Sequence, residues 1–236
     1  MKATTTEVQN NFGHYLKICQ HEKVVITKNG REVAELMGVS EVREDAPVYM
    51  GRGVPMSYQQ FQELARSSEK NYEYIDGEVF LLTSPLYPHQ RAVRGIFGEF
   101  IAWFRDKKCE PLVSPFDITL YRKGYNEKVS VVQPDILVIC DSEKIDDTGK
   151  YHGTPALLVE VLSKSTRSID LLKKLDLYME SGVQEYWIVD PSSQQVIIYC
   201  FQDYQIITVT TLKHKDAAES IIFPGLKVRL EQIFTN

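Results

Sequence analysis

The sequence contains no apolar run close to the roughly 18–20 residues that a membrane-spanning helix needs. Its first residues, MKATTTEVQNNFGHYL, lack the apolar core of a secretory signal. Internal repeats and low-complexity tracts are also missing. These absences exclude an integral membrane protein and a repeat protein, and they predict a globular, cytoplasmic chain.

Cysteine is scarce in this sequence. Cys19, Cys109, Cys140 and Cys200 are spread widely along the chain and include no C-x-x-C pair. This spacing favours neither a zinc cluster nor a disulfide framework, so we expect reduced thiols.

An excess of positive charge is missing as well. The chain has 27 Lys and Arg against 32 Asp and Glu, which gives a net charge of -5 and a pI near 5.6. A protein that coats nucleic acid without specificity is normally basic, so the composition disfavours that class. A net charge of -5 remains compatible with a local basic groove or with a metal site built from carboxylates.

What is present has the composition of a globular protein, with 43% hydrophobic and 25% charged residues among 236. That length allows one large domain with a small appendage, and residues 1–39 have the pattern of such an appendage. A helix is predicted after Thr4, and the Asn29-Gly30 turn between VVIT and VAEL predicts a β-hairpin. Because a unit this small cannot bury its apolar face alone, we expect it to dimerise or to pack on another surface.

Residues 40–56 mix charge, proline and glycine without periodicity, which is typical of a linker. Residues 57–236 then form a second, larger domain of alternating helical and strand patterns. We expect helices at 57–66, 89–107 and 168–181, a hairpin at Asp76-Gly77, and strands at 112–121, 129–140, 155–162 and in EYWIVD, QQVIIYCF and YQIITVTTL. This order predicts an α/β (α+β) fold, with a mixed sheet flanked by helices.

Two of the expected strands carry a carboxylate inside an apolar run. Asp135 lies in VVQPDILVIC, and Glu160 lies in PALLVEVLS. A carboxylate that is buried without a partner is strongly unfavourable, so each acid needs a cation or strong hydrogen-bond donors. Two such acids on neighbouring strands would bind a hard divalent cation such as Mg²⁺. The structural alternative is that each acid pairs with an arginine or a lysine.

A lysine for the same site is expected in the helix SIDLLKKLDLYMESG. At about 100° per residue, Lys173 lies on the solvated arc, whereas Lys174 lies at the edge of the buried surface beside Tyr178. Asp170 lies one turn before Lys174. Lys174 therefore either reaches the two acids or is a surface lysine paired with Asp170.

Together these segments resemble a known family. PDILVI, LLVEVLS, DLLKKLDLY and GVQEYWIVDP are similar to the Uma-type family of restriction-endonuclease-like proteins, within the PD-(D/E)xK nuclease superfamily. The similarity runs from about Met56 to Phe234 and includes YEYIDGEV. It implies a restriction-endonuclease-like fold, a DNA substrate and a Mg²⁺ or Mn²⁺ cofactor. It also implies Asp135 and Glu160 as catalytic metal ligands and Lys174 as a catalytic residue.

The sequence departs from the superfamily motif at one position. An acid-x-Lys triplet would place lysine at position 162, where Leu162 stands. The resemblance implies that this lysine has moved to the following helix, as Lys174. Lys164 is a rival, because residues 160, 162 and 164 share one face of a strand, but it lies past the apolar run.

Five further residues are additional candidates for the site. Glu73, in YEYIDGEV, would add a metal ligand or orient a water, or is a surface acid at the start of a hairpin. His89 would act as a general acid or phosphate contact, or is a polar residue in the first turn of a helix. Gln133 shares the Asp135 face of its strand, and Tyr178 and Asp170 would orient Lys174.

Residues 1–39 resemble the N-terminal half of Phd/YefM-type antitoxins, through EVQNNFGHYLKIC followed by VVITKNGREVAEL. The resemblance implies a module that dimerises or binds DNA, and a toxin-like protein as a further partner. A dimerisation element without a DNA role is the alternative.

The function that these residues predict is metal-dependent hydrolysis of DNA phosphodiester bonds by a homo-oligomer, most simply a dimer. The alternative is an antitoxin-like DNA-binding regulator with a catalytically degenerate nuclease fold, which the missing lysine at position 162 favours. A sugar hydrolase with paired carboxylates is a weaker alternative, because no aromatic platform is evident. Tyr186 and Trp187 are expected in the core.

Overall fold

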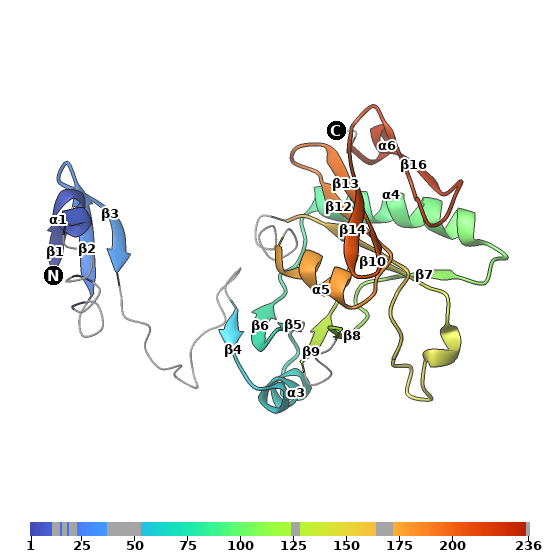
Figure 1. Ribbon diagram of the computed structural model, residues 1–236, viewed down its shortest axis with the longest axis horizontal. Helices are drawn as coiled ribbons and strands as arrows, with labels where there is room; N and C mark the ends of the chain where they lie inside the picture. The colour runs from blue at the N-terminus through green and yellow to red at the C-terminus, as the bar shows by residue number, and fades with distance from the viewer. Residues whose placement is uncertain are drawn as a thin grey trace. The chain divides into compact units, whose positions relative to one another are not determined.

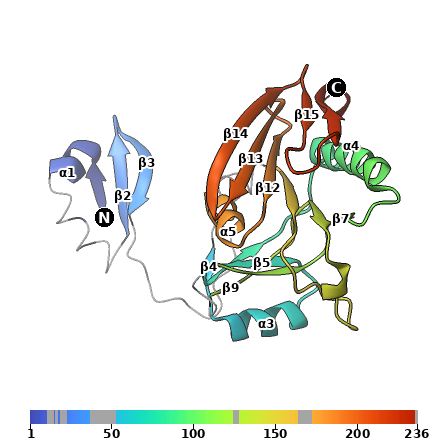
Figure 2. The same cartoon turned by 45° about the vertical axis from the view of Figure 1, so that its right-hand side comes forward.

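The computed structural model describes residues 1–10, 15, 18, 23–36, 53–123, 128–163 and 172–234. The chain forms two compact units, Met1–Pro47 and Val48–Asn236, drawn in Figure 1 and Figure 2. Within the described ranges, no helix is both long and apolar enough to cross a membrane.

The first unit is a three-stranded sheet with a helix. Its elements are β1 (Lys2–Thr4), α1 (Thr5–Asn10), β2 (Val24–Lys28) and β3 (Arg31–Leu36). β2 is the central strand, parallel to β1 and antiparallel to β3. Asn29 and Gly30 have φ angles of 52° and 75°, which are the positive values that the predicted Asn-Gly turn requires. The hairpin is therefore confirmed, whereas the sequence pattern did not indicate β1.

The second unit is built mainly from two sheets. Its strands are β4 (Val54–Pro55), β5 (Tyr72–Ile75), β6 (Glu78–Leu81), β7 (Glu110–Val113), β8 (Ile118–Tyr121), β9 (Val129–Val132), β10 (Ile136–Ile139), β11 (Leu157–Val161), β12 (Glu185–Asp190), β13 (Gln195–Gln202), β14 (Gln205–Lys213), β15 (Ala217–Glu219) and β16 (Lys227–Arg229). Its helices are α3 (Tyr58–Ser67), α4 (Tyr87–Phe104), α5 (Lys174–Glu180) and α6 (Leu230–Phe234), with a short 3-10 turn at Ser142–Lys144.

The larger sheet has six strands in the order β14-β13-β12-β11-β10-β7, and the smaller has five in the order β4-β6-β5-β9-β8. β11 and β12 run parallel, while the other neighbours in the larger sheet run antiparallel, so this sheet is mixed. β15 and β16 form a separate pair. The mixed sheet with flanking helices confirms the predicted fold class.

The two faces of the six-stranded sheet contribute to separate apolar cores. Ile96 and Phe100 of α4 pack with Val159 and Trp187 on one side. On the other side, Leu158 and Tyr186 share a core with residues of the five-stranded sheet and α5. Tyr186 and Trp187 are both 0% exposed, as expected for core residues. Because side chains alternate along a strand, Glu160 points to the same side as Leu158, toward the space between the two sheets.

Two expected strands are each divided between the sheets, which corrects the sequence interpretation. Residues 112–121 contain the end of β7, in the larger sheet, and β8, in the smaller one. Residues 129–140 are divided in the same way between β9 and β10. Pro115 and Pro134 lie at the two breaks, and proline has no N–H group to continue a sheet ladder.

The expectation of reduced thiols is wrong for one pair, because Cys109 and Cys140 form a disulfide. Cys109 precedes β7 and Cys140 follows β10, and these antiparallel neighbours pair Glu110 with Ile139. The next positions outward are the two cysteines, whose Cα atoms lie 4.1 Å apart. Strand pairing thus joins cysteines that are distant in the sequence. Cys200 is a free, buried thiol, and Cys19 lies outside the described residues.

Candidate active site

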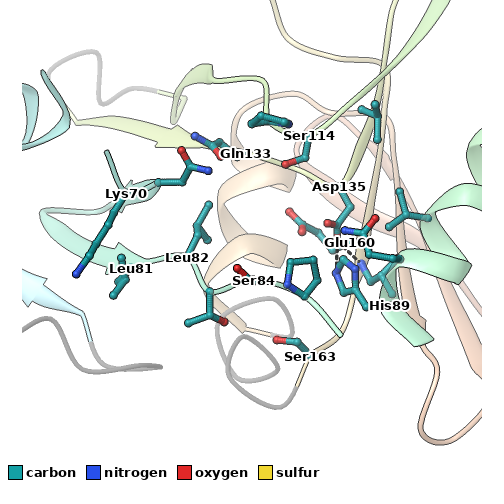
Figure 3. A pocket seen from close by; sticks show the side chains of 18 of the residues that line it. Lys70, Leu81, Leu82, Ser84, His89, Ser114, Gln133, Asp135, Glu160 and Ser163 are labelled. Atoms are coloured by element: carbon teal, nitrogen blue, oxygen red, sulfur yellow. Dashed lines mark hydrogen bonds and ion pairs between the residues drawn. The ribbon is translucent and has the colours of Figure 1, made fainter. Parts of the chain in front are cut away.

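A pocket of about 590 Å³ opens beside the junction of the two large sheets. Its wall contains five of the residues that the sequence singled out: His89, Gln133, Asp135, Glu160 and Lys174. In Figure 3 the side chains of His89, Asp135 and Glu160 point toward one another at one side of this pocket. The structure therefore brings together two acids and a lysine that lie on different elements.

Asp135 is held at the start of β10 by partners on two other elements. Its Oδ2 accepts a hydrogen bond of 2.8 Å from the backbone N–H of Val161, at the end of β11. His89 Nε2, in the first turn of α4, lies 3.2 Å from the same oxygen. The Asp135 side chain is 18% exposed, so it is oriented by the protein and still reaches the pocket.

Glu160 and Lys174 form a buried ion pair. Lys174 Nζ lies 2.8 Å from Glu160 Oε1, and the two side chains are 3% and 5% exposed. The Tyr178 hydroxyl donates a second hydrogen bond, of 2.6 Å, to the same oxygen. Burial and the neighbouring Glu160 carboxylate raise the pKa of Tyr178 well above its usual value, so this hydroxyl remains a donor. Tyr178 thus contacts Glu160 directly, in addition to lying one helical turn from Lys174.

Glu73 connects this pair to the five-stranded sheet. It lies on β5, is 2% exposed, and its Oε1 lies 2.9 Å from Lys174 Nζ. The same oxygen accepts a hydrogen bond of 2.9 Å from the backbone N–H of Gln133. The alternative that Glu73 is a surface acid is therefore wrong, because the side chain is buried against Lys174.

Gln133 and His89 each present a buried polar atom at the pocket wall. Gln133 Nε2 donates a hydrogen bond of 2.7 Å to Asp117. In the part of the chain that the structure describes, Gln133 Oε1 and His89 Nδ1 have no hydrogen-bond partner. Asp170, and the rival lysine Lys164, lie outside the described residues.

The position of α5 depends on a residue that the sequence analysis missed. Arg122 follows β8 and is 11% exposed; it donates hydrogen bonds of 2.6 Å to Glu180 at the end of α5 and to Asp76 in the β5–β6 turn. This bridge fixes the helix that carries Lys174 to the five-stranded sheet. No local motif marks Arg122, because its partners are distant in the sequence.

Asp135 and Glu160 are the residues that could hold a divalent cation. The described residues contain no group of three or more His, Cys, Asp or Glu side chains arranged around a metal position. Mg²⁺ commonly uses only one or two carboxylates and completes its shell with water and substrate phosphate. Asp135 and Glu160, at the wall of the pocket, are two carboxylates of the kind that such a shell uses.

Comparisons with known proteins agree with this fold. A crystal structure described as a "putative nuclease belonging to DUF820", from Anabaena variabilis, has a TM-score of 0.61 and 19% sequence identity. The similarity covers 76% of this chain and 98% of that one. An uncharacterized protein of Synechocystis sp. is 28% identical over 146 residues, which are 61% of this chain and 72% of the relative.

Sequence models of two families match the chain in separate regions. Residues 1–44 match the antitoxin Phd_YefM family of type II toxin-antitoxin systems. Residues 58–231 match the Uma2 family, which is described as "Putative restriction endonuclease". The second match spans most of the sequence and confirms the resemblance, so the chain belongs to the Uma2 family.

Proposed function

We propose that this protein is an endonuclease that hydrolyses DNA phosphodiester bonds with Mg²⁺ or Mn²⁺ bound by Asp135 and Glu160. One observation carries the proposal: the buried Lys174 ammonium lies 2.8 Å from Glu160 at a pocket that also contains Asp135. Two acids and a lysine are the groups that metal-assisted phosphodiester hydrolysis needs. The match to the Uma2 family, described as restriction endonucleases, supports this chemistry, and the Anabaena structure supports the fold.

In the proposed hydrolysis, Asp135 and Lys174 have different roles, which follow from their charges and positions. A bound divalent cation would act as a Lewis acid at the phosphate and lower the pKa of a water molecule. Asp135 is oriented for binding by Val161 and His89. Lys174 places a fixed positive charge beside Glu160, where it stabilises negative charge that builds on the phosphate.

Lys174 can also replace the lysine that the superfamily motif has at position 162, where this chain has Leu162. In the acid-x-Lys triplet the lysine would stand two residues after the acid, on the same side of the strand. Here Lys174 reaches Glu160 from α5, so the helix supplies the charge that Leu162 cannot. This contact supports catalysis over a degenerate site.

The test is cleavage of plasmid DNA by the full chain with Mg²⁺, with Mn²⁺ and with chelator. We expect metal-dependent cleavage that Asp135→Asn abolishes, together with loss of metal binding in calorimetry. Since the asparagine can still accept the Val161 N–H, folding should weaken by only about 1 kcal/mol. Asp147→Asn, which changes an exposed acid, is the matched control. No cleavage with either metal and no metal binding would reject the enzyme.

We propose that residues 1–39 form a dimerising and DNA-docking module, joined by residues 40–56 to the nuclease domain at 57–236. The Phd/YefM match supports this division. It also supports a second candidate function, that of a DNA-binding regulator with a toxin-like partner. The regulator predicts retention of DNA from upstream of its own gene, with steep salt dependence. Retention that is unchanged by deletion of residues 1–39 would reject a DNA role for the module.

A further inference from the structure

The outer strand of the six-stranded sheet, β14, is long and open on one side. It has nine residues, and among the described strands it pairs only with β13. Figure 2 shows β14 at the margin of its sheet. An edge strand presents a row of backbone N–H and C=O groups with which another strand can pair.

The side chains of β14 do not protect this edge. Ile206, Ile207 and Val209 are 43%, 54% and 52% exposed, although they are aliphatic. From Gln205 to Leu212 the strand has no charged residue and no proline. Natural edge strands commonly use such residues to prevent pairing with another chain, so the composition of β14 favours pairing.

The sequence of β14 is complementary to a second copy of itself. In antiparallel pairing about a two-fold axis at Thr208, residues equally distant from Thr208 lie opposite each other. Ile207 then lies opposite Val209 of the second copy, which pairs the two most exposed aliphatic side chains of the strand. The two-fold axis makes this contact occur twice. Aliphatic pairs stabilise neighbouring strands.

We infer that β14 pairs with β14 of a second copy, antiparallel about an axis at Thr208, so that one sheet runs through both chains. The inference does not depend on the proposed nuclease activity. It also concerns a different surface from residues 1–39, so a test must report on β14 itself and not only on the mass of the assembly.

A cysteine at the axis provides that test. In an antiparallel pair centred on Thr208, the two Thr208 Cα atoms come within the range that a disulfide can bridge. We expect full-length Thr208→Cys to form a covalent dimer under mild oxidation, seen in non-reducing electrophoresis. Cys200 lies opposite Thr208 on β13 and is replaced by alanine in all variants, which prevents a disulfide within one chain.

Thr210→Cys in the same background is the matched control. Thr210 is on the same face but lies opposite Ile206 of the second copy, about 13 Å along the strand from its own copy. It should give no more covalent dimer than the Cys200→Ala parent. Adding Val209→Lys to the Thr208→Cys chain should remove most of the covalent dimer, because a lysine would then face Ile207. Equal crosslinking at positions 208 and 210, or none above the parent, would overturn the inference.

Discussion

Glu73 and Glu160 share one lysine, since Oε1 of each carboxylate lies within 2.9 Å of Lys174 Nζ. Glu73 belongs to the five-stranded sheet and Glu160 to the six-stranded sheet. The lysine therefore links the two sheets as well as lining the pocket. Removing one member of a buried ion pair leaves a charge without its partner, which is more costly than the loss of a surface ion pair.

Lys174→Ala should lower the free energy of unfolding by about 3–5 kcal/mol, because it leaves two buried carboxylates without their shared cation. Urea unfolding measures this loss. Lys173→Ala is the control, since Lys173 is 40% exposed and pairs with the partly exposed Glu78. That variant should lose about 0–1 kcal/mol. Equal losses in the two variants would show that the Lys174 ion pairs are not a buried cross-link.

Glu73→Gln separates two roles for this acid. If Glu73 positions Lys174, the variant should bind Mn²⁺ normally in calorimetry and cleave DNA about 10–100-fold more slowly. The glutamine can still accept the Gln133 N–H, so the free energy of unfolding should fall by only about 1–3 kcal/mol. If Glu73 is instead a metal ligand, metal affinity falls together with activity.

The raised pKa of Tyr178 makes stability depend on alkaline pH. Below pH 10 the phenol is protonated in both the folded and the unfolded chain, and it contributes no pH dependence. Above pH 10 the unfolded chain releases this proton while the folded chain keeps it, so unfolding becomes more favourable as the pH rises. Tyr178→Phe should reduce this alkaline loss in thermal melts. An absorbance titration should then show one fewer late-ionising tyrosine, whereas Tyr121→Phe, at a 50% exposed position, should leave that number unchanged.

Reduction of the Cys109–Cys140 disulfide should destabilise the second unit. The bridge closes a loop with a sequence separation of 31, and a loop of that size corresponds to about 3–4 kcal/mol of chain entropy. Thermal melts with and without reductant measure the effect. The double variant Cys109→Ser/Cys140→Ser should melt at the lower temperature in both conditions. A parent chain insensitive to reductant would contradict the contribution of the bridge.

Features that depend on local chemistry were predictable from the sequence. Ser57 caps α3 through a capping box with Gln60, and the Asp76-Gly77 turn joins β5 to β6. Such signals lie within a few residues of the structure that they specify. Helix periodicity placed Lys174 at the edge of a buried surface, and the family resemblance indicated that it reaches Glu160.

Features that depend on which strands become neighbours were not predictable. The disulfide follows from the pairing of β7 with β10, and no spacing in the sequence records that register. The same is true of Arg122, whose partners Asp76 and Glu180 come from two other elements. Periodicity placed Tyr178 beside Lys174, but only the packing of α5 determines that its hydroxyl contacts Glu160.

The contact of Glu73 with Lys174 has a consequence for the newly synthesised chain. Asp135 and Glu160 lie on the side of the six-stranded sheet, while Glu73 lies on the five-stranded one. A folding intermediate with only one sheet formed cannot hold the lysine from both directions. Any activity of the pocket therefore requires both sheets to have formed, and a chain with only one of them has an incomplete site.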